Sequence, residues 1–270
     1  MRIKGYLNFF ARKLAYNSIS YKIYERMLWS QIKDEEKPGH IAVIVDGNRR
    51  WADRRSAPHS QGHESGADKI EELLRWCLNL GVRTITIYAF STENMKRREE
   101  QEVEDILRLF NERLRRIVKD RDIHNRRVRV RAIGRLNSLP PETQELIKDV
   151  EEATKDYDNH YLNIAVAYGG RAEIIDAMKR IAEEVKEGKL ESDDIDEKIV
   201  EDHLYTAHLP KSEPDLVIRT SGEERLSGFL LWQTAYSELC FMDVYWPDFR
   251  QIDLLRAIRT FQKRERRFGA

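Results

Sequence analysis

The sequence predicts an α/β protein with a single open, mostly parallel sheet of about six strands flanked by helices, preceded by an amphipathic helical N-terminal extension. Two observations predict this fold. From His40 onward, short apolar runs rich in Val and Ile alternate with longer segments in which apolar residues recur with a helical period. Before His40, large apolar residues are interleaved with basic ones. The alternation favours right-handed crossovers and one twisted parallel sheet.

The N-terminal extension and its linker are predicted to span residues 1–39, and the main domain residues 40–270. Residues 1–31 are predicted to form two short amphipathic helices with a break near residues 17–20. The polar sequence KDEEKPG at residues 33–39 follows as a linker. A basic amphipathic segment of this kind can contact a membrane surface or dock on its own domain, and the sequence leaves both open.

The main domain contains five recognisable strands and six helices. The predicted strands are the apolar runs at residues 41–45, 84–89, 128–133, 162–167 and 216–218. The predicted helices are the segments of helical period at residues 64–80, 99–120, 141–154, 171–186, 196–205 and 251–266. Glycines stop two of them, at Gly81 and Gly188, and Pro140 precedes a third. A further core helix is predicted from the apolar residues Phe229, Leu231, Trp232 and Tyr236.

Composition limits the class of protein. The chain has 47 basic and 47 acidic residues, so its net charge does not indicate nucleic-acid binding, and no such partner is expected. The arginines at residues 126–135 alternate with apolar residues, which favours a solvated strand edge. Only Cys77 and Cys240 are present, so neither a disulfide framework nor a zinc site is indicated. With no long apolar stretch and no signal peptide, we expect a cytoplasmic protein, with peripheral contact to the inner face of the membrane as an option.

Polar or glycine-rich sequence follows four of the predicted strands. The four segments are Asp46–Arg50, Ser91–Asn94, Tyr168–Arg171 and Arg219–Gly222. In open α/β sheets, ligands bind beyond the carboxyl ends of the strands. We therefore expect these four segments to gather at one rim of the sheet.

The predicted rim carries groups that bind phosphate. It has arginines, hydroxyls and flexible glycines, but few carboxylates; the arginines are Arg49, Arg50, Arg97, Arg219 and Arg225. Guanidinium groups, hydroxyls and exposed amides bind phosphate oxygens. A lone carboxylate such as Asp46 suits Mg²⁺, which is usually held by one or two carboxylates together with substrate phosphates. The local chemistry thus predicts a magnesium-diphosphate substrate.

The same residues also suit other functions. Asp46 could simply cap the turn after the first strand. A phosphatase that used Asp46 as its nucleophile would ordinarily carry a second Asp two positions later, where Asn48 stands. The chain has neither the GxxxxGK[ST] pattern of a P-loop nor a GxGxxG that opens a helix.

Several long motifs, colinear from about His40 to Gly269, resemble those of the cis-prenyltransferases, the undecaprenyl or dehydrodolichyl diphosphate synthases. The motifs are HIAVIVDGNRRWA from residue 40, GHESGA at 62–67, YAFSTENMKR at 88–97, NIAVAYGGR at 163–171, DLVIRTSGEERLSGFLLWQTAYSEL at 215–239, YWPDF at 245–249 and RERRFG at 264–269. Arg49 in DGNRRW, and the basic N-terminus, are more similar to the archaeal and eukaryotic branch.

The resemblance implies Mg²⁺-dependent addition of isopentenyl diphosphate units to an allylic diphosphate primer, each new double bond being cis. The primer would be geranylgeranyl or farnesyl diphosphate, and the archaeal likeness favours the former. The product would be a polyprenyl diphosphate of about undecaprenyl length, for a dolichol-type glycosyl carrier lipid. It would occupy an apolar tunnel lined by the helices at 64–80 and 99–120, which small Ala67 and Ala89 leave open.

The resemblance also implies roles for individual residues. Asp46 and Asn94 would be catalytic, Asp46 handling the Mg²⁺ and Asn94 serving the proton that leaves the new chain. Glu238 would be a second metal-linked carboxylate. The residues implied in substrate binding are Gly47, Asn48, Arg49, Arg50, Trp51, His59, His63, Ser91, Thr92, Glu93, Arg97, Arg219, Arg225, Ser227, Arg267 and Gly269.

Some of these roles have alternatives. His63 could be a helix N-terminal residue that only bonds to the backbone. His59 stands where many members carry arginine, and Met95 where a Trp is common, so two substrate contacts differ from the family pattern. Arg267 to Gly269 would reach across a homodimer into the partner's site. The main alternative function is a non-catalytic partner subunit, but such a chain should lack Asp46 or the arginines around it.

Overall fold

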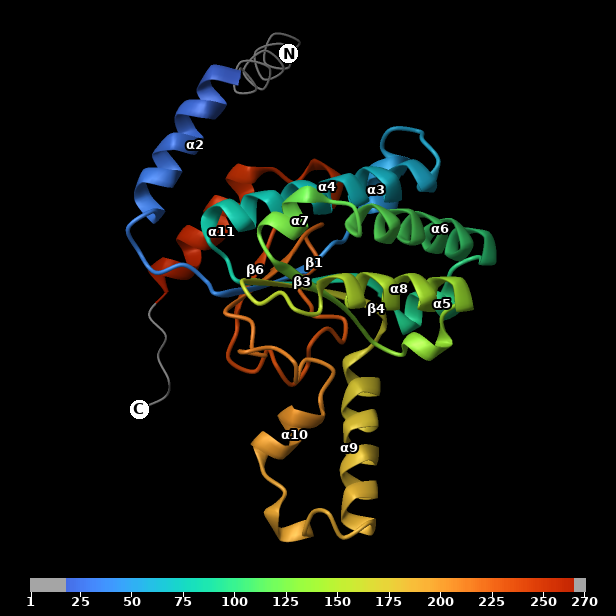
Figure 1. The fold of residues 1–270 in the computed structure, drawn as a ribbon. Helices are drawn as coiled ribbons and strands as arrows, with labels where there is room; N and C mark the ends of the chain where they lie inside the picture. Colours follow the sequence, from blue (N-terminus) through green and yellow to red (C-terminus); the bar gives the residue numbers. More distant parts are fainter. Residues whose placement is uncertain (1–17, 265–270) are drawn as a thin grey trace. The chain divides into compact units, whose positions relative to one another are not determined.

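The computed structural model describes residues 18–264, which divide into two compact units. The larger unit comprises residues 38–249, and the smaller one joins residues 18–37 to 250–264 (Figure 1). The division of the chain by function, into an extension with its linker at residues 1–39 and a main domain at residues 40–270, stays a prediction.

The larger unit contains one open sheet of six strands, all parallel, which confirms the predicted fold class. Its strand order is β3-β4-β2-β1-β5-β6. The strands are β1 (His40–Ile44), β2 (Thr84–Ser91), β3 (Val128–Ile133), β4 (His160–Tyr168), β5 (Leu216–Arg219) and β6 (Glu238–Phe241). Because β3 forms an edge, Arg129 and Arg131 lie on an edge strand, as predicted, and Arg126, Arg127 and Arg135 flank it.

Helices flank this sheet. The α-helices of the unit are α3 (Asn48–Asp53), α4 (His59–Leu80), α5 (Thr92–Arg97), α6 (Glu100–Ile117), α7 (Arg121–Asn125), α8 (Pro141–Thr154), α9 (Gly170–Lys186) and α10 (Glu197–His203). Short 3₁₀ helices are η1 (Leu136–Ser138), η2 (Ser192–Asp194) and η3 (Trp246–Asp248). Helices α4 and α6 lie over one face, while α9 and α10 extend away from the other side (Figure 1).

The predicted core helix around Phe229 is wrong, because residues 222–237 form a series of turns. Ser227, Gly228 and Leu230 all have positive φ, which interrupts any helix there. Phe229 and Leu230 are nonetheless fully buried, in a cluster with Ile44, Tyr88 and Tyr168 on the face of the sheet opposite α4 and α6, whereas Tyr236 is 74% exposed. The apolar residues of this segment therefore anchor a loop rather than a helix.

The smaller unit pairs two helices, α2 (Ser18–Ile32) and α11 (Gln251–Lys263). Arg256 Nε donates to Tyr24 Oη at 3.2 Å, and Gln262 Nε2 donates to the Ile32 carbonyl at 3.2 Å. The second predicted N-terminal helix thus exists and docks on α11; the first lies outside the described residues. Within residues 18–264 there is no helix with the length and hydropathy needed to span a bilayer.

A buried chain of polar side chains crosses the sheet near its amino end. His40 Nε2 lies 2.8 Å from Thr86 Oγ1, Asn163 Nδ2 donates to the same hydroxyl at 3.2 Å, and His208 Nε2 lies 2.9 Å from Asn163 Oδ1. Burial lowers the pKa of His40 from 6.5 to about 4, although Asp215 opposes this effect. His40 is therefore neutral in the folded protein at neutral pH.

Acid should destabilise the protein through His40. Between pH 6.5 and about pH 4 the unfolded chain binds a proton at His40 and the folded chain does not, so stability falls as the pH decreases through this window. The loss is on the order of 3 kcal/mol. Urea unfolding at about pH 7 and about pH 4 measures it in the wild type and in His40→Gln. The variant should lose less stability on acidification; equal losses would contradict the prediction.

Candidate active site

The carboxyl ends of the strands bring the predicted polar segments together. In the parallel register, Ile44 of β1 lies beside Tyr88 of β2 and Arg219 of β5. Asp46, two residues after β1 ends, consequently meets the side chain of Arg219. The rim that the topology predicts is present in the structure.

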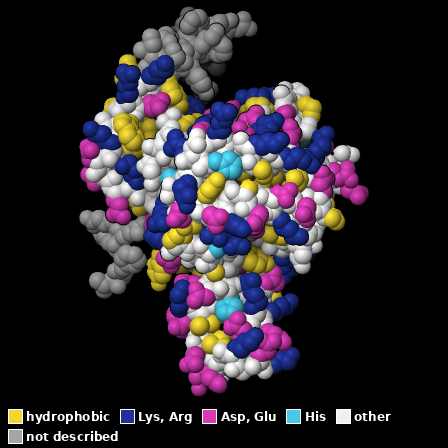
Figure 2. All heavy atoms as spheres, in the orientation of Figure 1, with side chains coloured by type: hydrophobic (Ala, Val, Ile, Leu, Met, Phe, Trp, Pro, Cys, Tyr) yellow, Lys and Arg dark blue, Asp and Glu magenta, His cyan; other side chains and the backbone are white. Residues whose placement is uncertain are grey.

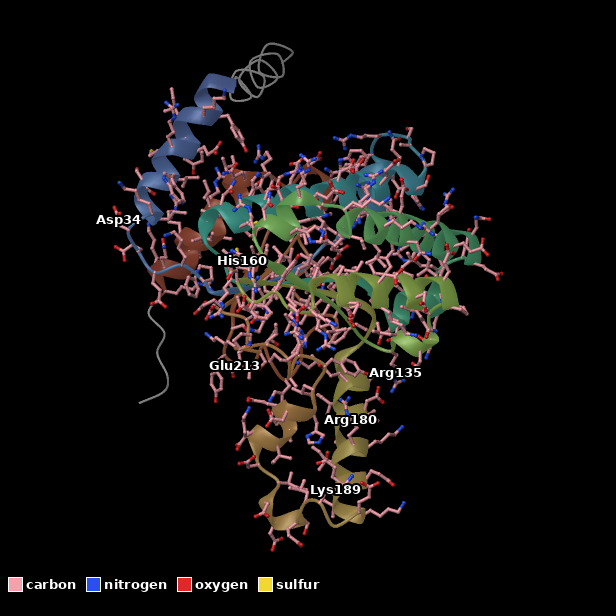
Figure 3. The ribbon with its side chains drawn as sticks, in the orientation of Figure 1. Asp34, Arg135, His160, Arg180, Lys189 and Glu213 are labelled. Atoms are coloured by element: carbon pink, nitrogen blue, oxygen red, sulfur yellow. The ribbon has the colours of Figure 1, made fainter. Side chains whose placement is uncertain are left out.

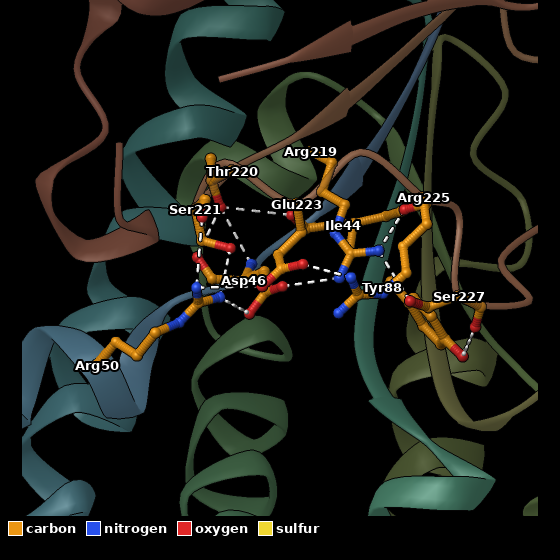
Figure 4. A network of polar contacts seen from close by, with 10 residues as sticks. All are labelled: Ile44, Asp46, Arg50, Tyr88, Arg219, Thr220, Ser221, Glu223, Arg225 and Ser227. Carbon is orange, nitrogen blue, oxygen red and sulfur yellow. Dashed lines mark hydrogen bonds and ion pairs between the residues drawn. The ribbon is translucent and has the colours of Figure 1, made fainter. Parts of the chain in front are cut away.

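Asp46 is held between two arginines (Figure 4). Its Oδ2 accepts from Arg219 Nη2 at 2.8 Å and its Oδ1 accepts from Arg50 Nη2 at 3.3 Å. Burial by itself raises the pKa of Asp46, but the hydrogen bond and positive charge of Arg219, with the charge of Arg50, outweigh it, so the pKa lies below the usual value. Asp46 is therefore ionised at neutral pH and available to a cation.

Arg219 also binds the loop that follows β5. Its side chain is only 4% exposed, and its Nη1 donates to Ser227 Oγ at 2.8 Å and to the Arg225 carbonyl. Tyr88 supports the same loop, because its hydroxyl donates to the Ser227 carbonyl at 3.4 Å and its ring stacks on Phe229 at 4.6 Å. One buried guanidinium thus connects Asp46 to the loop that carries Arg225 and Ser227.

Gly47 and Asn48 form a close-fitting wall of the site. Gly47 has φ 105°, and a Cβ at this position would lie 2.9 Å from the ring of Tyr245, so only glycine fits. The Oδ1 of Asn48 is buried without a hydrogen-bond partner, against Gly66. An unpaired buried amide oxygen is costly and indicates a position where a ligand or water completes the hydrogen bonding.

His63 belongs to a charged cluster with α6. Its Nε2 lies 3.0 Å from Glu102 Oε1, to which Arg98 Nη1 also donates at 2.7 Å. Burial lowers the pKa of His63, so a neutral ring is favoured at neutral pH. Arg98 was not predicted from the sequence, which indicated the neighbouring Arg97 instead. Both arginines line the site, but Arg98 is the more buried of the two.

Most of the predicted residues line one cavity of about 680 Å³ beyond the strand ends. Those residues are Asp46, Asn48, His63, Ser91, Glu93, Asn94, Arg97, Arg219, Arg225 and Ser227. Gly47, Arg49 and Arg50 line an adjoining polar hollow together with Asp46. Asn94 is fixed at the start of α5, where its backbone N–H donates to Ser91 Oγ at 3.0 Å.

Four predicted residues in the described part of the chain line neither this cavity nor the adjoining hollow. Trp51 Nε1 donates to Asp248 Oδ1 at 2.9 Å, His59 Nε2 lies 2.9 Å from Asp53 Oδ1, and Thr92 Oγ1 donates to Glu93. Glu238 lies at the amino end of β6, level with Leu216, whereas Asp46 lies beyond the carboxyl ends. Arg267 and Gly269 fall outside the described residues.

The donor set fits a metal held jointly with substrate. Among residues 18–264 there is no group of three or more His, Cys, Asp or Glu side chains that could hold a metal by themselves. Asp46 supplies one ionised carboxylate, surrounded by arginines that suit phosphate. This composition matches Mg²⁺, which takes one or two carboxylates plus substrate phosphate oxygens.

An apolar tunnel of about 190 Å³ runs between the sheet and helices α4 and α6. The tunnel and the polar cavity share lining residues, namely Val45, Asn48, His63, Ala89 and Ile106. The predicted tunnel, with Ala67 and Ala89 in its wall, is therefore present and opens from the site. Ile87 of β2 and Ile164 of β4 form part of its floor, because the register places them side by side.

Glu173 on α9 is a supporting residue that sequence reasoning missed. It is 1% exposed and accepts hydrogen bonds from the Tyr205 amide at 2.9 Å, from Gln233 Nε2 at 3.2 Å and from the Tyr168 hydroxyl. Burial raises its pKa. The sequence signal was its spacing with the buried Ala177 and Ile181, which puts an acid on the apolar stripe of a helix.

The fold and site together would suit an amphiphilic diphosphate: a rim of arginines and one carboxylate for the charged head, and an adjoining tunnel for an apolar tail. Comparison with known proteins identifies the family. The chain belongs to the cis-prenyltransferases, since residues 44–269 match the family model described as "Putative undecaprenyl diphosphate synthase".

Curated relatives support this assignment. A protein of Methanocaldococcus jannaschii is 53% identical over 253 residues, which cover 94% of this chain and 90% of the relative. A Pyrococcus furiosus protein is 52% identical, covering 93% of this chain and 94% of the relative. Both are named tritrans,polycis-undecaprenyl-diphosphate synthase (geranylgeranyl-diphosphate specific).

Solved structures show the same fold. Lavandulyl diphosphate synthase from Lavandula x intermedia, in complex with dimethylallyl diphosphate, has a TM-score of 0.83 at 36% identity, covering 87% of this chain and 99% of that one. A probable undecaprenyl diphosphate synthase from Campylobacter jejuni has a TM-score of 0.70 at 34% identity, covering 87% of this chain and all of that one.

Removal of Glu173 should destabilise the fold around the site. In Glu173→Ala, the three groups that donate to the carboxylate lose their acceptor inside the protein, so the free energy of unfolding should fall by about 2–4 kcal/mol. Glu183→Ala on the same helix removes only an exposed pair with Lys186 and should cost less than about 0.5 kcal/mol. Chemical denaturation of both variants tests this; a similar small loss in each would contradict it.

Proposed function

We propose that the protein elongates an allylic diphosphate primer with isopentenyl diphosphate units, in a Mg²⁺-dependent reaction that forms cis double bonds. The observation that carries the proposal is the position of the Asp46–Arg50–Arg219 cluster at the mouth of an apolar tunnel. Charged head and apolar tail then have adjoining places in one cavity. A non-catalytic subunit would have no reason to keep this cluster assembled.

The allylic diphosphate is proposed to bind beside Gly47, Asn48, Arg49 and Arg50. It must leave as an anion while positive charge develops on the carbon that it leaves, so fixed cations and amide donors aimed at its oxygens lower the barrier. Arg50 and Arg219 pair with Asp46 in this structure and have guanidinium donors for phosphate oxygens. Bound Mg²⁺, held by Asp46 and phosphate oxygens, would neutralise charge on the leaving diphosphate.

Isopentenyl diphosphate is proposed to bind to Arg219, Arg225 and Ser227, which lie on one side of the cavity. Arg219 contacts both Asp46 and Ser227, so it would place the second substrate next to the first. Asn94 lines the same cavity, where it can contact the proton that leaves the new chain. Because an amide is a poor base, we propose that Asn94 relays this proton to a diphosphate oxygen.

We propose geranylgeranyl diphosphate as the primer, ahead of farnesyl diphosphate, and a product of about undecaprenyl length used as a dolichol-type carrier lipid. Two relatives that are 52–53% identical to this chain are named undecaprenyl-diphosphate synthases specific for geranylgeranyl diphosphate. Ala67 and Ala89 in the tunnel wall are small, so they leave room for the chain to enter.

The protein is proposed to be cytoplasmic, with residues 1–31 in contact with the membrane that receives its lipid product. Within α2, which pairs with α11, Ile23, Met27 and Trp29 are 62%, 44% and 40% exposed. Large apolar side chains exposed on one helix suit a peripheral membrane contact.

Nucleic acid is not a proposed ligand. Among the arginines at residues 126–135, Arg127 pairs with Asp158 at 3.0 Å and Arg135 pairs with Asp176 at 2.9 Å. Arg135 lies near the start of α9 (Figure 3), and basic and acidic side chains are interspersed over the face in Figure 2. Such pairing leaves little positive potential for a phosphate backbone.

Replacement of Asp46 should abolish most of the activity. With labelled isopentenyl diphosphate, Mg²⁺ and allylic primers, Asp46→Asn should lower kcat at least ~100-fold, because the metal-binding charge is lost. Asp158→Asn, at an exposed pair with Arg127, serves as the matched control and should retain wild-type turnover. No label in the lipid phase with the wild type, or undiminished label with Asp46→Asn, would refute the proposed enzyme activity.

A homodimer is proposed, in which Arg267 to Gly269 complete the partner's site. Deletion of residues 265–270 should then reduce turnover at least ~10-fold, in line with the loss of a charged donor. Mixing the deletion variant with Asp46→Asn should restore activity, because a mixed dimer has one site with both Asp46 and a partner's tail. Unchanged turnover after the deletion, or no recovery on mixing under conditions of subunit exchange, would contradict the dimer proposal.

A further inference from the structure

The outer wall of the tunnel has a seam between α4 and α6 that ion pairs close. Arg113 of α6 donates through Nη2 to Asp68 Oδ1 at 2.7 Å and through Nη1 to Glu71 Oε1 at 2.6 Å. Asp68 and Glu71 are three residues apart on α4, so they lie on one face of that helix. A single guanidinium therefore bridges a full turn of the opposite helix.

The position of Arg113 makes this bridge part of the tunnel wall. Arg113 and Glu71 both line the tunnel, and the side chain of Arg113 is 15% exposed, whereas those of Asp68 and Glu71 are 62% and 43% exposed. The guanidinium is thus more buried than the two carboxylates that accept from it. A bidentate guanidinium bridge is directional and resists separation of the two helices.

The tunnel is too small for a long prenyl chain unless its walls move. Its volume is about 190 Å³. For comparison, a cavity of about 150 Å³ binds one benzene molecule, so the present space accommodates roughly one five-carbon unit. A product of several such units needs a wider tunnel, and α4 and α6 form the outer wall that the Arg113 bridge holds together.

Neighbouring ion pairs do not have this geometry. Arg108 pairs with Asp105 and Arg116 pairs with Glu112, both within α6. His63 and Glu102 do connect α4 to α6, but they lie at the mouth, in the site already described. Among the described residues, Arg113 provides the ion-pair bridge between α4 and α6 away from that site.

We propose that Arg113, by bridging Asp68 and Glu71 across the seam, limits how far α4 and α6 separate and thereby limits the length of the product. This inference rests on the proposed elongation activity and goes further by assigning chain-length control to a polar bridge on the outer wall. Removal of the bridge should let the tunnel widen further before the chain is released.

The test compares product lengths at equal consumption of labelled isopentenyl diphosphate. Products are dephosphorylated and separated by reversed-phase chromatography. Arg113→Met, which keeps an unbranched apolar stem, should shift the mean length upward by at least one five-carbon unit. Arg113→Lys, which keeps the charge but can hold only one acceptor well, should give a smaller shift. Arg108→Met is the matched control on the same helix and should leave the distribution unchanged.

Each outcome separates the inference from the proposed function. A wild type that forms no labelled lipid sinks the proposed function itself. Two results would overturn the inference alone, provided that the wild type elongates the primer. One is the same distribution of product lengths for Arg113→Met and Arg108→Met, and the other is shorter products for Arg113→Met. If Arg113→Met does not fold, the double variant Asp68→Asn with Glu71→Gln removes the same bridge at more exposed positions. It must then lengthen the product for the inference to stand.

Discussion

The ion pair between Asp46 and Arg219 is the contact on which the rest of the site depends. It joins the ends of neighbouring strands, and Arg219 is almost completely buried there. A buried guanidinium without its acceptor would be strongly destabilising, so the pair has to form in the absence of substrate. Because Arg219 also binds Ser227 and the Arg225 carbonyl, the same contact fixes the neighbouring loop. The charges of the site are therefore in place before any ligand binds.

The alternation of side chains along the strands gives the site its two sides. Val45, Ile87 and Ile164 face the tunnel, whereas Ile44 and Tyr88 face the cluster that buries Phe229 and Leu230. The tail of one substrate would thus lie on one face of the sheet, and the loop for the second is anchored on the opposite face. The two meet at the strand ends, where neither face is covered. The two faces of one sheet would thus serve the growing chain and the second substrate, and the two places adjoin at the strand ends.

Much of this arrangement could be predicted from the sequence, because strong local patterns encode it. The apolar runs identify five strands, and the rule for parallel sheets places Asp46 and Arg219 at one rim. The turns at 222–237 could not be predicted, since positive φ at Ser227 and Leu230 is imposed by packing and not by residue type. Strand β6 has four half-buried residues and no distinctive pattern, so the location of Glu238 could not be predicted either. Glu173 shares the helical spacing of Ala177 and Ile181, but this spacing indicates a supporting role only once the structure shows that Glu173 is buried.

The location of Glu238 has a chemical consequence for the metal. In the sheet, Glu238 of β6 lies beside Leu216 of β5, and Leu216 lies beside Ile41 of β1. Ile41 is three residues before Ile44, the last residue of β1. Glu238 and Ile44 are therefore separated by about 10 Å along the strands and by about 10 Å across two strand spacings, and Asp46 lies further along still. Within one chain, Glu238 and Asp46 cannot share an ion. Mg²⁺ at Asp46 would then take its other ligands from diphosphate and water, so its affinity should depend on bound substrate. Asp46 would hold the metal through one carboxylate, and Arg50 and Arg219 on either side of it would supply donors for the diphosphate.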